Sequence, residues 1–392
     1  MKKILALLLA VTMVACLFAG CQNGTTEPTD PATEPTTDVT TEPTTEPATE
    51  PASEDATVPS TDGAKKVAFV TDVGNIDDHS FNQYSYEGVT KFCSNAGLEC
   101  SYYKPAGDTD QDRIDAINQA VKDGYGVVVM AGYLFGPACY TVATEHPEVL
   151  FLALDVTEGD LKAESVPSNI ALICYQEEQA GYLAGYAVVM DGYTKLGFTG
   201  GGGGTNPACC RYGYGFVEGA NAAAAEMGVN VEVNYSWEYG ASFSASQELQ
   251  AMASGWYETG TEIIFACGGS MFQSVAAAAS ANDAAVVGVD VDQSFESDTV
   301  VTSAMKGLAD ATKWAIAKVY DGTWSEIGGK ATSLGVNENA VGLPTATWSM
   351  TNYTVEEYED LFQKVASGEL TIDADYEANL EQDWSNLTLN II

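Results

Sequence analysis

The sequence predicts an α/β fold of two doubly wound, parallel-sheet lobes that are joined by a hinge and separated by a ligand cleft. After Lys66, short β-branched or aromatic runs alternate with longer segments of helical periodicity, which is typical of parallel strands covered by helices on both faces. About ten such strands exceed what one lobe comfortably holds. The pattern also restarts near Lys195, which indicates a second, similar lobe.

Strands are expected where apolar runs such as GVVVM and VLFLAL are bounded by polar residues, at 67–71, 98–103, 126–130, 149–154, 170–174, 195–199, 229–236, 262–266, 285–289 and 299–303. Helices are expected at 81–96, 109–122, 137–146, 177–190, 212–227, 244–258, 271–281, 307–320 and 354–367. We assign residues 65–174 and about 291–345 to the first lobe, and residues 175–290 and about 346–392 to the second. Ligands of such sheets gather beyond the carboxyl ends of the strands, so the residues that follow each strand are the candidates for binding.

The charge balance excludes several classes of protein. The 392 residues include 55 acidic and 16 basic side chains, a formal net charge of −39 at pH 7. A surface this acidic repels phosphate backbones and anionic lipid, which argues against nucleic-acid binding and against electrostatic attachment to membranes. The sequence contains only 2 histidines, too few for a multi-histidine metal site.

Residues 1–21 have the layout of a secretory signal peptide, because two lysines precede an apolar run that ends in small residues. The run is short for a membrane-spanning helix. Its end, LFAGC, resembles the lipobox of bacterial lipoproteins, which implies that Cys21 is lipidated and becomes the mature N-terminus. Cys16 is a second candidate for that role.

Residues 22–64 repeat Thr, Pro and Glu without apolar periodicity. Such a segment buries too little surface to offset its ordering entropy, so we expect a disordered linker that holds the folded body away from the membrane. The linker contains 10 of the acidic residues and the signal peptide 2 of the basic ones, so the body itself is acidic.

Seven cysteines remain in the body, an odd number without CxxC spacing: Cys93, Cys100, Cys139, Cys174, Cys209, Cys210 and Cys267. Most lie in apolar runs, so buried free thiols are expected. A vicinal disulfide between Cys209 and Cys210 is the alternative.

The loop after the first strand, TDVGNIDDHSFNQ, is the most polar in the body. Asp78, His79 and Ser80 are consecutive and their side chains diverge, so they do not form a catalytic triad. We expect Ser80 to cap the helix that begins near Phe81, and His79 to face solvent. The glycine run 200–204 lacks the spacing of a phosphate loop and is interpreted as a turn near the cleft.

The string VAFVTDVGNIDDHSFNQYSYEGV resembles the N-terminal signature of the BMP family, basic membrane lipoproteins that are nucleoside-binding components of ABC transporters. Further matches follow in order over residues 66 to about 320: Asn169 with EEQAGYLAG, Gly213 to Gly219 with Phe216, YGASF, Gly268-Gly269, GVDVDQ and TSAMK. The resemblance implies a type I periplasmic-binding-protein-like fold without cofactor or metal. It also implies a monomeric receptor, extracytoplasmic and lipid-anchored to the cell membrane, that delivers purine nucleosides to the permease and ATPase of an ABC importer.

The same resemblance implies the site residues. The base is expected between Phe81 and Phe243, one from each lobe, while Asp290 matches the family's ribose-binding carboxylate. Four further residues complete the implied site: Asp72, Asn82, Gly268 and Lys306.

Two other functions stay open from the residues. Nucleoside hydrolases begin with a strand and DTDPGxDD, whose aspartates bind calcium; here Val70 and Val73 replace the first Asp and the Pro, and an extra residue precedes Asp77-Asp78. The insertion redirects the later carboxylates away from one cation. A receptor of the same fold that senses a sugar or a signalling molecule is the third possibility.

Overall fold

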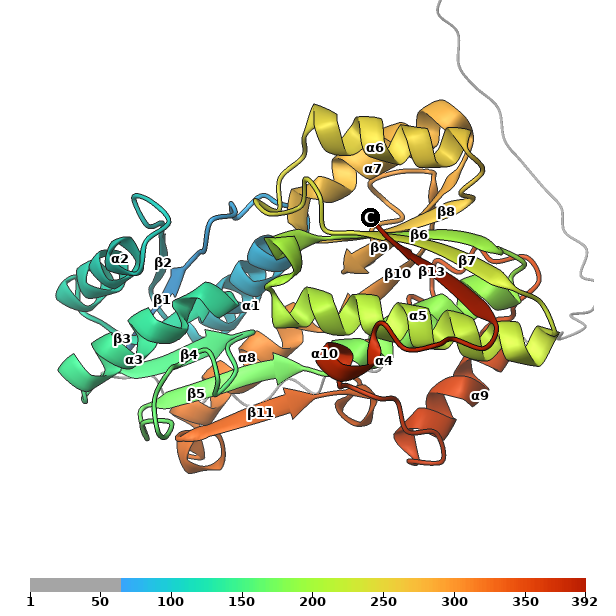
Figure 1. Ribbon diagram of the computed structural model, residues 1–392. Helices are drawn as coiled ribbons and strands as arrows, with labels where there is room; N and C mark the ends of the chain where they lie inside the picture. The colour runs from blue at the N-terminus through green and yellow to red at the C-terminus, as the bar shows by residue number, and fades with distance from the viewer. Residues whose placement is uncertain (1–64) are drawn as a thin grey trace, which may run out of the picture. The chain divides into compact units, whose positions relative to one another are not determined.

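Two sheets organise residues 65–392, the part of the chain that the computed structural model describes (Figure 1). The expected signal peptide 1–21, the lipidated Cys21 and the linker 22–64 lie outside the described residues. None of the helices in residues 65–392 combines the length and apolar character needed to cross a membrane.

The first lobe is built on a six-stranded sheet of order β11-β5-β4-β3-β1-β2, in which all neighbours are parallel. Its strands are β1 (Lys66–Val70), β2 (Cys100–Tyr103), β3 (Tyr125–Ala131), β4 (Leu150–Leu154), β5 (Ile170–Tyr175) and β11 (Lys330–Leu334). One face is covered by α1 (Phe81–Ala96) and α8 (Leu308–Tyr320), the other by α2 (Asp110–Lys122) and α3 (Gly136–Glu145).

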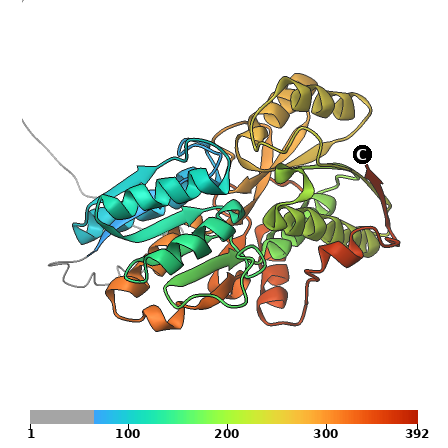
Figure 2. The same ribbon diagram turned by 60° about the vertical axis from the view of Figure 1, so that its left-hand side comes forward.

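The second lobe is built on a seven-stranded sheet of order β12-β10-β9-β8-β6-β7-β13, parallel except for β12. Its strands are β6 (Lys195–Gly200), β7 (Val231–Ser236), β8 (Ile263–Cys267), β9 (Ala285–Asp290), β10 (Val300–Lys306), β12 (Val341–Gly342) and β13 (Leu387–Ile391). Helices α4 (Glu177–Met190) and α5 (Pro207–Met227) cover one face, and α6 (Gln247–Glu258) and α7 (Phe272–Asn282) the other (Figure 2).

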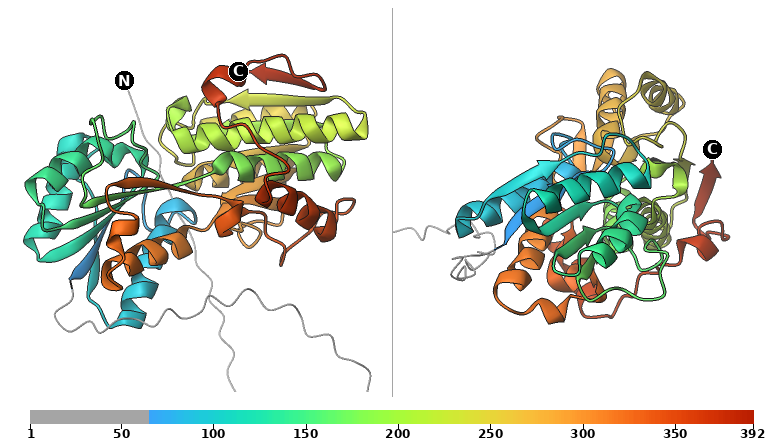
Figure 3. Two further views of the ribbon diagram at one scale, coloured as in Figure 1. Left: turned by 90° about the horizontal axis from the view of Figure 1, so that it is seen from below. Right: turned by 90° about the vertical axis from the view of Figure 1, so that its left-hand side faces the viewer.

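The remaining elements are short or lie outside the sheets. Helix α9 (Val355–Ala366) packs on α4, and α10 (Tyr376–Asn379) precedes β13, which runs along β7 at the edge of the second sheet (Figure 3). Five 3-10 helices are η1 (Tyr133–Phe135), η2 (Gly201–Gly204), η3 (Gly269–Met271), η4 (Trp324–Glu326) and η5 (Val336–Glu338) in the described residues.

The two-lobed, doubly wound fold is confirmed, and the ten expected strands all form. Helix α5 begins at Pro207 rather than near residue 212, because Asn206 caps it by accepting from the backbone N–H of Cys209 at 2.9 Å. Strands β11, β12 and β13 and helix α10 were not expected, since each is short or follows no strong apolar run.

One expected boundary between the lobes is wrong. Strand β10 was assigned to the first lobe, which was expected to resume near residue 291, but β10 pairs with β9 in the second sheet. The chain returns to the first lobe only after Lys306, and β12, also assigned to the first lobe, pairs with β10. The error has a physical cause: β9 and β10 are parallel neighbours joined by a loop without an α-helix, so the usual strand–helix–strand pattern is absent there.

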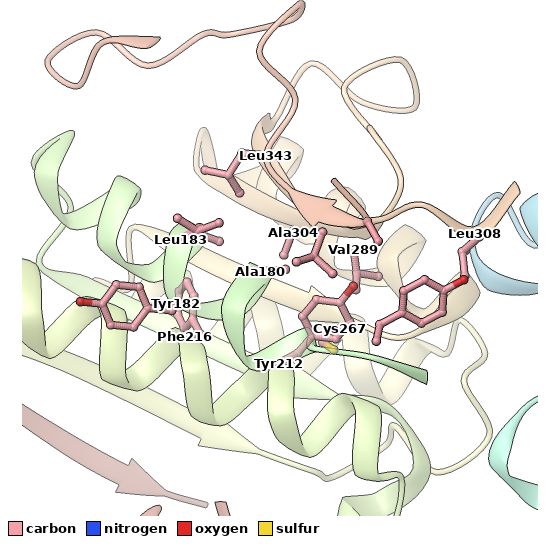
Figure 4. Close-up of a cluster of buried hydrophobic side chains, with 14 of the residues drawn as sticks. Ala180, Tyr182, Leu183, Tyr212, Phe216, Cys267, Val289, Ala304, Leu308 and Leu343 are labelled. Atoms are coloured by element: carbon pink, nitrogen blue, oxygen red, sulfur yellow. The ribbon is translucent and has the colours of Figure 1, made fainter. Parts of the chain in front are cut away.

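The largest buried core runs through both lobes and reaches the second sheet from the side of α4 and α5. In Figure 4, Leu183 of α4 and Phe216 of α5 lie among this cluster, together with residues of β8, β9 and β10. The described cysteines all carry free thiols, and six of the seven are buried, as expected.

Replacing Phe265 by alanine tests the core of the second lobe. Phe265 is 0% exposed, and its ring centroid lies 5.3 Å from that of Phe216 and 5.5 Å from that of Phe198. We expect the free energy of unfolding to fall by about 3–5 kcal/mol, measured by urea denaturation with circular dichroism. The matched control is Phe295→Ala, because Phe295 is 82% exposed, and its effect should stay within about 0.5 kcal/mol. Similar losses in the two variants would contradict this packing.

Candidate functional site

One cleft collects loops from the carboxyl ends of strands in both lobes, with about 870 Å³ of space including its open mouth. The first lobe contributes residues after β1, β3 and β4, and the second contributes the ends of β8, β9 and β10. This is the place where open parallel sheets hold their ligands.

All seven residues expected at the site line this cleft: Asp72, Phe81, Asn82, Phe243, Gly268, Asp290 and Lys306. The fold therefore brings together side chains that are spread over most of the body sequence. The two expected aromatic residues are each half-buried in the cleft wall, Phe81 from the first lobe and Phe243 from the second.

Two glycines allow Phe243 to lie close to the backbone. A Cβ atom at Gly201 would lie 2.3 Å from the Phe243 ring, and one at Gly268 would lie 3.1 Å from it. Gly268 also has φ +147°, which side chains rarely adopt. The glycine run 200–204, interpreted from the sequence as a turn, thus also makes room for an aromatic side chain of the cleft.

Lys306 is the buried cation of the site. Its Nζ lies 2.5 Å from Asp155 Oδ2, 3.5 Å from Glu177 Oε1 and 3.6 Å from Asp290 Oδ1. It also lies 4.8 Å from the centroid of the Phe81 ring. Burial opposes the charge of the amine, but these carboxylates outweigh it and raise the pKa of Lys306 well above its ordinary value. The amine is therefore charged, and it joins carboxylates from both lobes.

Both aspartates beside Lys306 lie at the carboxyl end of a strand and have a left-handed backbone conformation. The φ angle is 56° at Asp155 and 68° at Asp290, values that are uncommon for residues other than glycine. Burial raises the pKa of Asp155 to about 6, with Lys306 opposing the shift, and burial likewise raises the pKa of Asp290. Asp155 Oδ1 is buried and has no hydrogen-bond partner in the described part of the chain, so it is available to a ligand hydroxyl.

Asp72 is held by its own loop and by Asn82. Its Oδ1 accepts hydrogen bonds from the Gly74 N–H at 2.7 Å and from Asn82 Nδ2 at 3.0 Å. The Asn82 amide also donates to Asp78 Oδ2, and its Oδ1 accepts from Thr71. Burial raises the pKa of Asp72 to about 6, although these hydrogen bonds oppose the shift. Asn82 thus orients Asp72, whose Oδ2 has no such internal bond in the described residues.

The cap of helix α1 differs from the expectation. Ser80 makes no side-chain capping bond; Asp78 instead accepts from the backbone N–H groups of Asn82 and Gln83, each at 3.0 Å. A carboxylate suits this position because its two oxygens can accept hydrogen bonds from several N–H groups at the start of the helix. Its negative charge also interacts favourably with the positive end of the helix dipole. His79 is partly exposed, as expected, and its Nδ1 lies 2.9 Å from Glu296 Oε1.

The same cap weighs against the calcium-binding hydrolase. Both oxygens of Asp78 accept hydrogen bonds from N–H groups at the start of α1, which leaves this carboxylate fewer lone pairs for a calcium ion. No group of three or more His, Cys, Asp or Glu side chains within residues 65–392 is arranged to hold a metal ion.

Sequence reasoning missed three polar residues of the site. Asp155 directly follows β4, so the rule applied to the other strand ends should have found it. Glu177 is the first residue of α4, is fully buried, and one of its carboxylate oxygens lies 2.7 Å from the Arg211 guanidinium. The search of residues directly after each strand could not find it, because Glu177 does not directly follow a strand. Ser80 was assigned to the wrong partner, because its true contact lies 210 residues away in the sequence.

The substitution Lys306→Met tests the charge cluster. We expect the free energy of unfolding at pH 8 to fall by about 3–5 kcal/mol, because buried carboxylates lose their counter-charge. Without the amine, the already raised pKa values of Asp155 and Asp290 rise further. The folded variant then binds protons as the pH falls, so its stability should recover toward pH 5.

Urea denaturation of wild type and variant at both pH values measures this difference. The matched control is Lys318→Met, because Lys318 pairs at 2.7 Å with the exposed Glu326 and such pairs contribute at most about 1 kcal/mol. A loss in Lys306→Met that is no larger than the control, or that grows as the pH falls, would contradict the assignment.

Known proteins similar to this chain include ABC transporter components. The family described as "ABC transporter substrate-binding protein PnrA-like" matches residues 65–375. The chain is 27% identical over 329 residues to the CD4+ T-cell-stimulating antigen of Listeria monocytogenes, covering 78% of this chain and 87% of that protein. It is 26% identical over 305 residues to the ABC transporter nucleoside-binding protein BmpA of Lactococcus lactis, covering 72% of this chain and 82% of that protein.

Among solved structures, an ABC transporter solute-binding protein from Aeropyrum pernix K1 superposes with a TM-score of 0.67 at 21% identity, covering 81% of this chain and 96% of that one. This likeness shows the fold. The match over residues 65–375 shows the family: the chain belongs to the PnrA-like ABC transporter substrate-binding proteins, the Bmp family.

Proposed function

We propose that this protein captures purine nucleosides by closure of its two lobes and delivers them to an ABC importer. The observation that carries the proposal is the presence, in one cleft, of half-buried Phe81 and Phe243 from opposite lobes beside Asp290 and Lys306. Two rings suit a flat heterocycle, and carboxylates and an amine suit ribose hydroxyls. The printed name of the Lactococcus relative, a nucleoside-binding protein, supports the same ligand class.

The charge of the cleft favours a neutral ligand. Five aspartates line it, and Lys306 is the single cation among the described lining residues. Lys306 is already engaged by Asp155, Asp290 and Glu177, so little positive charge is left for a phosphate. A nucleoside carries no phosphate, whereas a nucleotide would meet uncompensated repulsion.

The magnitudes suffice for useful affinity. Stacking on an aromatic ring contributes about 1–3 kcal/mol per base, and each hydrogen bond to a charged group contributes about 1.5–3 kcal/mol. Two rings and two such bonds reach micromolar affinity after the cost of association. A ligand that contacts both lobes stabilises the closed form, which a permease can distinguish from the open form.

In this proposal Cys21 carries the lipid that anchors the protein to the outer side of the cell membrane. The Thr/Pro/Glu-rich linker 22–64 gives the body reach toward a permease and its ATPase. The body acts as a monomer and performs no chemistry on the ligand.

Isothermal calorimetry with inosine tests the proposal. Phe81→Ala and Asp290→Ala should each weaken binding at least tenfold, because one removes a stacking face and the other a charged acceptor. Phe295→Ala is the control for loss of an aromatic side chain, because Phe295 is exposed and absent from the cleft lining, and its affinity should equal that of the wild type. Absence of inosine binding, unchanged affinity in both site variants, or release of free hypoxanthine in the presence of calcium would overturn the proposal.

The affinity should also depend on pH through Asp72. The pKa of this carboxyl is raised to about 6, so it is mainly ionised at pH 7.5 and mainly protonated at pH 5. If the ionised form accepts a hydrogen bond from the ligand, affinity for inosine falls as the pH drops through 6. Calorimetry on Asp72→Asn should show weaker binding at pH 7.5 and a shallower pH dependence. An identical pH dependence in wild type and variant would argue against contact between Asp72 and the ligand.

A further inference from the structure

Ser80, the residue before α1, reaches across the cleft instead of capping its helix. Its side chain is fully buried, and its Oγ donates a hydrogen bond to Asp290 Oδ2 at 2.6 Å. Ser80 belongs to the loop between β1 and α1 in the first lobe, and Asp290 ends β9 in the second. Because Asp78 satisfies the exposed N–H groups of α1, the Ser80 hydroxyl is free to bind the other lobe.

His79, next to Ser80, also contacts residues of the second lobe. The backbone carbonyl of His79 accepts from Gln293 Nε2 at 3.3 Å, and His79 Nδ1 lies 2.9 Å from Glu296 Oε1. Gln293 is itself held within the second lobe, because its Oε1 accepts from the Val289 N–H at 2.9 Å. The β1–α1 loop therefore contacts the end of β9 once and the β9–β10 loop twice, and the Ser80–Asp290 bond is the buried contact.

This bond determines how Asp290 is presented. One carboxylate oxygen accepts from Ser80, and the other lies 3.6 Å from the Lys306 amine. With one oxygen held from each side, the carboxylate has little freedom to rotate, and its remaining lone pairs have fixed directions. Its backbone is also strained, at φ 68°, which fits a side chain whose position is set by its partners.

We propose that Ser80 is a positioning residue that orients the Asp290 carboxylate in the cleft through a bond that joins the two lobes in the arrangement that the structure shows. The inference rests on the proposed nucleoside function for its effect on affinity. Opening the lobes breaks the Ser80–Asp290 bond and leaves Asp290 free to turn, while closing them restores the orientation that a ligand hydroxyl meets. This hydrogen bond thereby couples ligand recognition to lobe closure.

The test is a double-mutant cycle with Ser80→Ala and Asp290→Asn, using inosine as the probe in calorimetry. Ser80→Ala should weaken binding about tenfold to a hundredfold, since a hydrogen bond to a buried charge is lost. The double variant should bind no more weakly than Asp290→Asn alone, because the serine acts through the aspartate. Binding of 2′- and 3′-deoxyinosine gives a second readout: wild type should lose affinity when the hydroxyl that meets Asp290 is missing, and Ser80→Ala should lose less.

Ser85→Ala is the matched control. Ser85 lies on the same helix and is also fully buried, but its hydroxyl has no hydrogen-bond partner within residues 65–392. The same truncation there should leave inosine affinity unchanged. Equal affinity losses in Ser80→Ala and Ser85→Ala, wild-type affinity in Ser80→Ala, or additive effects of Ser80→Ala and Asp290→Asn would each overturn the inference.

A ligand-free measurement separates the two proposals. The same cycle in urea denaturation should show coupling between Ser80 and Asp290 without any nucleoside, because the bond joins the lobes in the arrangement that the structure shows. If wild type fails to bind inosine while this coupling is present, the proposed function fails and the positioning of Asp290 by Ser80 stands. If wild type binds inosine and neither cycle shows coupling, the positioning role alone is wrong.

Discussion

The contact of the Lys306 amine with carboxylates of both lobes is the constraint on which the site depends. Moving one ammonium and three carboxylates out of water is costly, and attraction offsets that cost only if the groups stay close. Asp155 comes from the first lobe and Asp290 from the second, and Glu177 is the first residue of α4, which packs on the second sheet. Separation of the lobes pulls these charges apart and lets water in, so the electrostatics of the cleft and the position of the lobes are linked.

The internal repeat of the fold places equivalent groups on the two sides of this amine. In the first lobe β3 is followed by Gly132, a 3-10 helix and an α-helix. In the second lobe β8 is followed in the same order by Gly268, a 3-10 helix and an α-helix, and both glycines have positive φ. In each lobe an aspartate of positive φ stands at the carboxyl end of the next strand: Asp155 directly follows β4, and Asp290 is the last residue of β9. Duplicated strand ends therefore supply two similar carboxylates, and one lysine from β10 serves both.

The repeat also explains how much the sequence could predict. Ten strands and the longer helices were visible because their apolar periodicity is local. Phe81 and Asp290 were assigned to the site through the family resemblance, and both lie where such an element begins or ends. Asp155 was equally accessible, since it holds the position in the first lobe that Asp290 holds in the second. The partner of Ser80 and the pairing of β10 could not be found this way, because both depend on contacts between distant segments that leave no periodic pattern.

The acidity of the whole body and the design of the cleft point to the same class of solute. A body with this charge attracts cations and repels anions at long range, yet inside the cleft the field is partly balanced by one buried amine. An anionic solute is disfavoured both far from the protein and inside the cleft. A cation would compete with Lys306 for carboxylates that are already paired. A neutral molecule with hydroxyl donors avoids both costs, because it can bind the unpartnered oxygen of Asp155 without adding or removing charge. The proposed selectivity for a neutral solute thus rests on the pairing of one lysine with several acids.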